Sequence, residues 1–110
     1  MLTQTKPDAA RILADIHGDK RFFCQDGCAI KNLTELVDCL NHMTEEEFRH
    51  YVTSERNDFS NWIRDVIGDE KLAIKLNSAR SPFEASKIVA NKMAWLQRIR
   101  IQHRRLNTRK

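Results

Sequence analysis

The chain has 110 residues, a formal net charge of +4, 41% hydrophobic residues and 31% charged residues, which indicates one folded domain rather than a disordered chain. No apolar run approaches the roughly 18 residues that cross a bilayer, and three cysteines are too few for a disulfide-rich secreted scaffold. These features exclude the membrane-spanning, collagen-like and disulfide-rich classes, and the polar start of the chain favours a cytoplasmic protein.

The N-terminal part of the chain predicts one helix followed by a small hairpin. Pro7 precedes the expected helix and Gly18 follows it, which is the usual asymmetry of helix ends. Three apolar residues share one face of this helix: Ile12, Leu13 and Ile16. Asp26-Gly27, between two short apolar runs, predicts a hairpin near residues 22–30. Two short strands alone are marginally stable, so we expect the hairpin to pack against helices.

Two more helices are predicted after the hairpin, and each begins at a capping signal. Asn32 and Thr44 are suitable N-cap residues, and Glu35 and Glu47 follow them by three positions, as in a capping box. Apolar residues then recur at helical spacing. They are Leu33, Leu36, Val37 and Leu40 in the first helix, and Phe48, Tyr51 and Val52 in the second.

The rest of the chain predicts three helices. Asn57 or Asp58 caps the first of them, Gly68 ends it, and Asp69 caps a short helix that follows. Residues 81–84 form another capping signal with Pro at the first helical position, and no helix breaker follows. The apolar positions of these helices are Phe59, Trp62, Ile63 and Val66, then Leu72, Ala73 and Leu76, then Ile88, Val89, Met93, Trp95, Leu96 and Ile99.

These elements predict an all-α fold: a compact bundle of five or six short helices, with one small β-hairpin near residues 22–30 and a long C-terminal helix. We expect residues 1–97 to form a single helical domain, and residues 98–110 to be a basic extension that can continue the last helix. The predicted core consists of Leu13, Ile16, Phe22, Leu36, Val37, Leu40, Phe48, Val52, Phe59, Trp62, Ile63, Val66, Leu72 and Leu76.

The net charge divides into two segments of opposite sign. Residues 1–86 contain 11 Lys/Arg and 15 Asp/Glu, whereas residues 87–110 contain eight Lys/Arg and no acidic residue. The body is therefore −4 and the C-terminal segment +8, and such a segment is where a polyanion would bind. The alternative is that the segment folds back on the acidic body. We expect that the chain can be cut between the body and the basic segment, and that the two halves then show which of them carries the activity.

Asn57-Asp58-Phe59-x-x-Trp62 allows a structural and a functional interpretation. In the structural one, which we favour, Asn or Asp caps a helix and the two aromatic residues are core anchors one turn apart. In the functional one, the motif is a recognition surface. Capping needs only one of Asn57 and Asp58, so the other side chain bonds the Asp26-Gly27 hairpin or is free for a partner.

Several motifs between residues 22 and 76 resemble a known family. They are Phe22-Phe23, Gly27, Lys31-Asn32-Leu33-Thr34-Glu35-Leu36, Phe48-Arg49-His50-Tyr51-Val52 and Asn57-Asp58-Phe59-Ser60-Asn61-Trp62-Ile63. Together they resemble a family of short helical microbial domains of unknown function. The chain departs from the family pattern at Tyr51, where the pattern has His, while its own His50 lies one residue earlier. The resemblance implies a helical fold and no specific activity.

Four residues have the chemistry and spacing of a candidate zinc site: Cys24, Cys28, Cys39 and His42. A structural zinc ion takes four nitrogen or sulfur ligands in a tetrahedron. Against zinc, Cys39 lies beside the apolar face of its helix, where a free cysteine behaves as a small apolar residue. A Cys24–Cys28 disulfide is another alternative, although an intracellular setting disfavours it.

Motifs for catalysis are weak in this sequence. His50 has Glu46, Glu47 and Arg49 nearby, but no Ser or Cys nucleophile with a paired base stands out. The chain also contains no Gly-rich phosphate loop and no His-Glu-x-x-His motif. We therefore predict that the protein is not an enzyme, has no catalytic residues and needs no cofactor, with zinc as the one candidate.

These observations favour a non-catalytic protein-interaction module that binds another protein or a second copy of itself. The interaction or structural motif residues are His50, Asn57, Asp58, Phe59 and Trp62. The alternative is a nucleic-acid binding protein, because Arg side chains bind phosphate through paired hydrogen bonds and stack on bases. Its predicted contacts are Lys92, Arg98, Arg100, Arg104, Arg105, Arg109 and Lys110. A metal-dependent protein that uses the Cys/His cluster is a weaker alternative.

Overall fold

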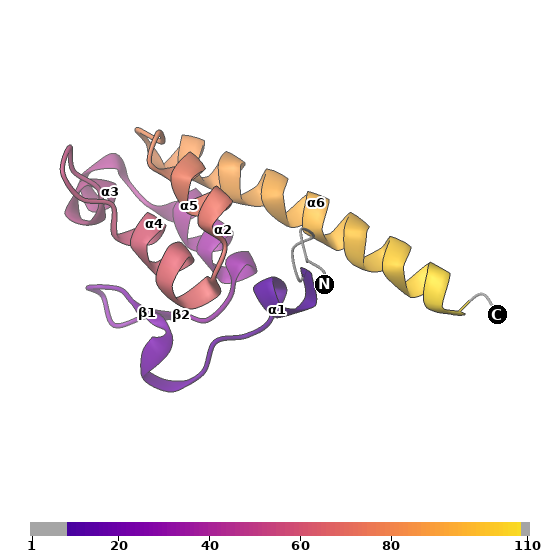
Figure 1. Cartoon of the computed structure of the whole chain (residues 1–110). Coiled ribbons are helices and arrows are strands. Elements are labelled where there is room, and N and C mark those ends of the chain that lie inside the picture. The colour runs from indigo at the N-terminus through magenta and orange to yellow at the C-terminus, as the bar shows by residue number, and fades with distance from the viewer. Residues whose placement is uncertain (1–8, 109–110) are drawn as a thin grey trace.

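The structure is a computed structural model that describes residues 9–108, with side chains described for residues 9–100. Its elements are α1 (Ala9–Leu13), the 3-10 helix η1 (Gly18–Lys20), β1 (Phe22–Phe23), β2 (Ala29–Ile30), α2 (Leu33–His42), α3 (Glu45–Tyr51), α4 (Asp58–Trp62), the π-helical turn η2 (Ile63–Ile67), α5 (Glu70–Leu76) and α6 (Pro82–Thr108). The predicted helical fold, with one antiparallel hairpin and a long C-terminal helix, is confirmed (Figure 1).

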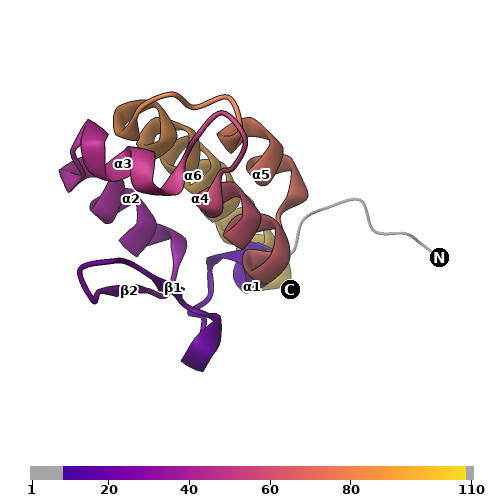
Figure 2. The same cartoon turned by 90° about the vertical axis from the view of Figure 1, so that its left-hand side faces the viewer.

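The core lies where α6 packs against α1, α2 and α5 (Figure 2). Predicted core residues that are buried are Phe22, Leu36, Leu40, Phe48, Phe59, Trp62, Ile63, Leu72 and Leu76. The others lie half-buried at the edge of the core: Leu13, Ile16, Val37, Val52 and Val66. Val89 and Leu96 of α6 are fully buried as well. The first part of the basic segment, which begins at Lys87, is therefore packed in the core of the fold.

An aromatic cluster joins the hairpin to α3 and α4. The ring of Phe59 stacks on that of Phe22 with 4.9 Å between centroids and on that of Phe48 with 6.0 Å between centroids. Trp62 meets Phe22 edge-on and donates its indole N–H to the carbonyl of Lys20 at 2.8 Å. The two-residue strands are thus held by packing against helices, as expected for strands too short to be stable alone.

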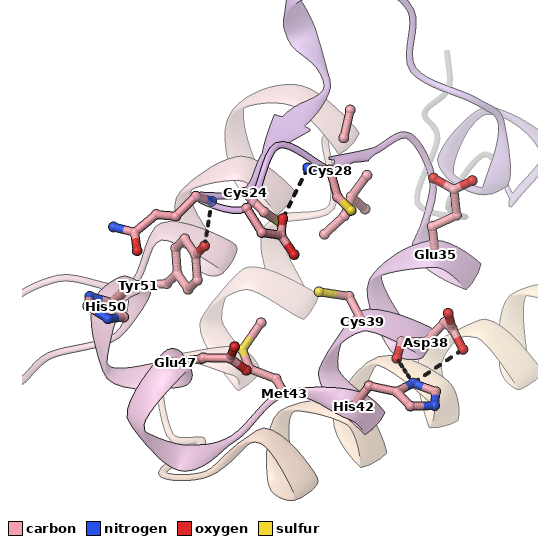
Figure 3. Close-up of a pocket in the computed structure, with 14 residues that line it drawn as sticks. Cys24, Cys28, Glu35, Asp38, Cys39, His42, Met43, Glu47, His50 and Tyr51 are labelled. Carbon is pink, nitrogen blue, oxygen red and sulfur yellow. Dashed lines mark hydrogen bonds and ion pairs between the residues drawn. The ribbon is translucent and has the colours of Figure 1, made fainter.

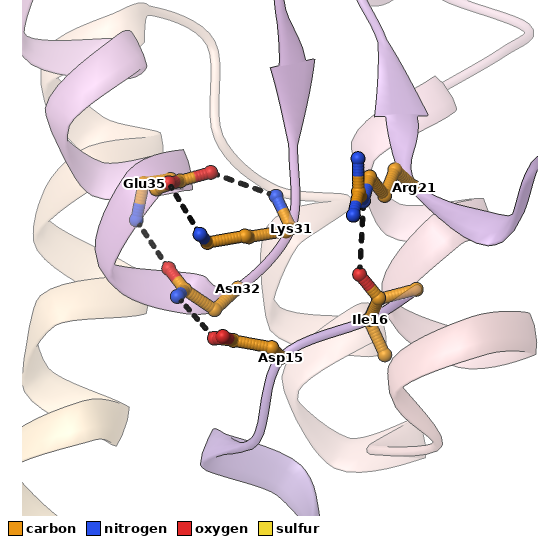
Figure 4. A network of polar contacts seen from close by, with 6 residues as sticks. All are labelled: Asp15, Ile16, Arg21, Lys31, Asn32 and Glu35. Atoms are coloured by element: carbon orange, nitrogen blue, oxygen red, sulfur yellow. Dashed lines mark hydrogen bonds and ion pairs between the residues drawn. The ribbon is translucent and has the colours of Figure 1, made fainter. Parts of the chain in front are cut away.

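The first helix is shorter than predicted. α1 ends at Leu13, whereas the sequence pattern suggested a helix as far as residue 17. The backbone N–H of Ile16 donates to the carbonyl of Lys31 at 2.6 Å, and Arg21 donates to the carbonyl of Ile16 (Figure 4). The amide of Asn32 also donates to Asp15 at 2.7 Å. These contacts with the chain between the hairpin and α2 replace the last turn of the helix.

The predicted caps mostly form. Thr44 and Glu47 make both bonds of a capping box, and the side chain of Asn32 accepts from the backbone N–H of Glu35. The carboxylate of Glu35 instead accepts from the N–H of Lys31, one residue before the cap. Ser81 and Glu84 repeat this shifted pattern, with Glu84 accepting from the N–H of the residue before Ser81. None of the helices in the described range 9–108 is both long and apolar enough to cross a membrane.

Candidate functional site

An open cleft lies between the hairpin, α2 and α3, with a volume of about 750 Å³ (Figure 3). This is within the roughly 300–1,000 Å³ of small-molecule sites. Its lining includes all four predicted metal ligands, namely Cys24, Cys28, Cys39 and His42, and also His50 and Tyr51. The fold therefore brings the Cys/His cluster and part of the predicted interaction motif to one place.

The cysteines of the cleft are all free thiols. Cys24 and Cys39 are half-buried and line the cleft from the hairpin side and from α2, respectively. The Tyr51 hydroxyl accepts the backbone N–H of Gln25 at 3.0 Å. Burial raises the pKa of the Cys39 thiol to about 12, and burial is also the main reason that the pKa of Cys24 is raised. Both thiols are thus protonated near neutral pH.

His42 lies apart from the thiols. Its Nδ1 is 2.8 Å from the carbonyl oxygen of Asp38 and 3.7 Å from the carboxylate of the same residue (Figure 3). In the part of the chain whose side chains are described, no group of three or more His, Cys, Asp or Glu side chains is arranged to hold a metal ion. Zinc stays a prediction of the sequence, which metal analysis of untagged protein tests.

We expect the protein to lose stability in alkaline solution. A thiol in the unfolded chain ionises near the ordinary pKa of 9.0, whereas Cys39 in the fold resists ionisation up to about pH 12. Between these values the unfolded state is stabilised by losing a proton that the folded state keeps, so the free energy of unfolding falls as pH rises above 9.0. Urea titrations at increasing pH measure this fall, and it should be shallower in Cys39→Ala.

Tyr51 lines the cleft, although the sequence pattern predicted it as a core residue of its helix. Its spacing from Phe48 indicated a core residue, and its ring does pack 5.2 Å from that of Phe59. Its hydroxyl, however, points to the cleft and bonds the hairpin (Figure 3). The amphiphilic character of tyrosine, which presents an apolar body and a polar tip, was the available signal.

The Asn57-Asp58-Phe59-x-x-Trp62 motif serves the fold. Asn57 caps α4 by accepting from the N–H of Ser60, and its amide donates to the carbonyl of Leu76 at 3.0 Å. Phe59 and Trp62 are 1% and 7% exposed, respectively. The remaining side chain, Asp58, pairs with Arg56 at 3.1 Å and not with the hairpin.

The predicted polyanion contacts divide into three groups. Arg98 and Arg100 are exposed on α6. Lys92 is engaged inside the protein, because its Nζ lies 3.3 Å from the carboxylate of Asp69 and 4.8 Å from the ring centroid of Trp95. Arg104 and Arg105 lie on the described backbone of α6 but beyond the described side chains, and Arg109 and Lys110 lie outside the described residues.

Trp95, one of the predicted apolar positions of the last helix, lies outside the core. It is 42% exposed, whereas its neighbour Leu96 is fully buried. Adjacent residues on an α-helix point about 100° apart, so one of the two had to leave the core. Trp95 follows Lys92 by three positions and precedes Ile99 by four, which places these side chains on one face of α6. Counting these intervals would have revealed the second face of the helix from sequence.

Comparisons with protein-family models, curated proteins and solved structures give no match to this chain. The resemblance to the family of short helical microbial domains therefore stays a prediction of the sequence.

Proposed function

We propose that the protein is a non-catalytic interaction module that binds an acidic protein partner through α6. The observation that carries this proposal is the course of the helix. α6 continues without a break to Thr108, away from α2–α5, so its basic end does not fold back on the acidic body (Figure 1). A helix of 27 residues is about 40 Å long, and the whole molecule is 52 × 24 × 23 Å.

The described part of α6 supports a protein partner through its mixed surface. Trp95 is exposed and Ile99 is half-buried on the same face, and Arg98 and Arg100 are exposed beside them. Trp and Arg are the residue types enriched at the energetic centres of protein interfaces. A basic helix with an apolar face binds well in a groove that is apolar inside and acidic at the rim.

A comparison of captured proteins tests this proposal. We expect immobilised wild-type protein to retain a partner from extracts of its own host, and the Trp95→Ala/Arg98→Glu/Arg100→Glu variant to lose it. The matched control is Lys71→Glu/Lys75→Glu, which reverses two exposed charges on α5. Equal capture by the α6 variant and the wild type would show that α6 is not the binding surface.

Nucleic-acid binding is the second candidate, favoured by the absence of acidic residues from Lys87 to Lys110 and by the exposure of Arg98 and Arg100. Here we expect the affinity for a fluorescent duplex or single strand to fall steeply with salt concentration. Reversing the charges of Arg98 and Arg100 should lower the slope of log K against log salt by about 2. An unchanged slope would rule out phosphate contacts at these arginines.

A further inference from the structure

The cleft between the hairpin, α2 and α3 has a strongly negative lining. None of its described lining residues is Lys or Arg, whereas four are acidic, which gives the cleft a formal charge of −4 with histidine neutral. Charges of one sign that line a cleft concentrate the field there and attract a ligand of the opposite sign. The acidic residues of this cleft, which we call the acidic cleft, are Asp26, Glu35, Asp38 and Glu47.

The contacts of these carboxylates leave most of the negative charge without a neighbouring cation. Asp26 and Glu47 accept neutral backbone N–H groups at 3.0 and 2.9 Å, respectively. Asp38 lies beside a histidine on the next turn of α2, and Glu35 is 4.0 Å from the Nζ of Lys31. One lysine at the limit of ion-pair distance cannot balance four carboxylates, so the cleft suits a basic ligand with several charges.

The walls and the size of the acidic cleft fit the end of a basic helix. Ile30, Met43 and Tyr51 line it between the carboxylates. Apolar and aromatic walls of this kind suit Arg and Lys, whose side chains combine an apolar stem with a charged head. A helix about 11 Å wide with a rise of about 1.5 Å per residue occupies roughly 140 Å³ per residue, so a cleft of about 750 Å³ accommodates about five residues.

The chain itself has a basic helix end, at the other end of the molecule. Residues 87–110 contain eight Lys/Arg and no acidic residue, and Arg98 and Arg100 are exposed. α6 is one unbroken helix as far as Thr108 and runs away from the hairpin and α3, along the 52 Å axis of the molecule (Figure 1). A continuous helix cannot turn back, so its basic end does not reach the acidic cleft of the same chain.

We propose that the acidic cleft receives the basic end of α6 from a second copy of the chain. This inference rests on the function proposed for α6 and names its acidic partner, the cleft of another copy. The two surfaces that meet are different, so the contact is head-to-tail. Each pair keeps one open cleft and one open helix end, to which further copies add until a ring closes or a chain grows.

Sedimentation of the full-length protein tests the proposal, after nuclease treatment so that nucleic acid cannot bridge the copies. We expect the mass of the wild-type complex to rise with protein concentration at about 0.01 M salt, where charges interact over roughly 30 Å. The mass should return to that of one chain at about 1 M salt, where this range is about 3 Å.

Neutralising the cleft should weaken the association by about tenfold or more. The cleft variant is Asp26→Asn/Asp38→Asn/Glu47→Gln, which removes three charges and keeps the oxygens that accept N–H groups in the hairpin turn and the capping box. The matched control changes the net charge equally at three exposed residues outside the cleft, and it should associate like the wild type. This control is Asp19→Asn/Glu55→Gln/Glu70→Gln.

A mixture of two variants identifies the surfaces that meet. Arg98→Glu/Arg100→Glu keeps the acidic cleft and reverses two charges of α6, whereas the cleft variant keeps α6 intact. Neither should associate alone. Their mixture should form complexes of two chains and no larger ones, because one intact helix end meets one intact cleft and no second contact remains.

Three results would overturn this inference: a wild type that remains a single chain at low salt, a cleft variant that associates as strongly as the wild type, or a mixture that forms no complex. The capture experiment described for α6 separates this failure from that of the proposed function. If the wild type is a single chain but α6 still captures a host protein, only the inference of a second copy fails. If capture does not depend on α6, the proposed function fails.

Discussion

Phe59→Ala is expected to lower the free energy of unfolding by about 3–5 kcal/mol. The Phe59 side chain is 1% exposed and lies at the centre of the aromatic cluster, against Phe22, Phe48 and Tyr51. Its removal leaves a cavity between the hairpin and two helices, which this small core can only partly close. Urea unfolding followed by the fluorescence of the tryptophans measures the change. Native stabilities of about 5–15 kcal/mol make this a large fraction of the total.

The control for Phe59 is Phe23, an exposed phenylalanine of β1 that lies next to Phe22 in the sequence. Phe23 is 59% exposed, so Phe23→Ala should change the free energy of unfolding by less than about 0.5 kcal/mol. A similar loss in the two variants would contradict the assignment of Phe59 as a core anchor. It would instead favour the interpretation of the Asn57-Asp58-Phe59-x-x-Trp62 motif as a surface for recognition.

Asp69→Asn is expected to lower the free energy of unfolding by about 3–5 kcal/mol, although asparagine is as good an N-cap as aspartate. Asp69 is 6% exposed, caps α5 through the N–H of Leu72, and directs its other oxygen to Lys92 at 3.3 Å. Substitution by asparagine keeps the cap and removes the charge. The ammonium of Lys92, itself 14% exposed, is then left without its counter-charge in a partly buried site. Chemical denaturation at neutral pH measures the loss.

A double-mutant cycle separates the ion pair from the cap. Lys92→Met fills the same space without a charge, so Asp69→Asn/Lys92→Met should recover most of the stability that Asp69→Asn loses. The matched control is Asp65→Asn, which breaks an exposed pair with Arg64 and should leave the free energy of unfolding nearly unchanged, because solvent screens the two charges. If the double variant were as unstable as Asp69→Asn, the unpaired lysine would not be the cause.

Structural elements that depend on residues close together in the sequence were predictable. The hairpin at Asp26-Gly27, the capping box of Thr44 and the caps at Asn57 and Asp69 all depend on residues within a few positions of one another, and each forms as expected. Helix periodicity also identified most of the core. These are features for which one stretch of chain contains the whole signal.

Contacts between distant segments explain what the sequence interpretation did not find. α1 stops at Leu13 because Ile16 bonds Lys31 across the fold, and this competition has no local signature. Cys24 and Cys39 line one cleft because the hairpin docks beside α2, which no local pattern predicts. The partner of Lys92 could not be identified either, because Asp69 reaches it only when α5 lies on α6.

The burial of Val89 and Leu96 bears on how the protein folds during its synthesis. These residues of α6 complete a core whose other walls, α1 and α2, are made much earlier. While α6 is still inside the ribosome, the apolar faces of α1 and α2 have no cover and remain open to aggregation or to chaperones. The capped helices can form as local structure, but the hydrophobic interior closes only when α6 has emerged. The core of the protein therefore forms after synthesis has passed Leu96.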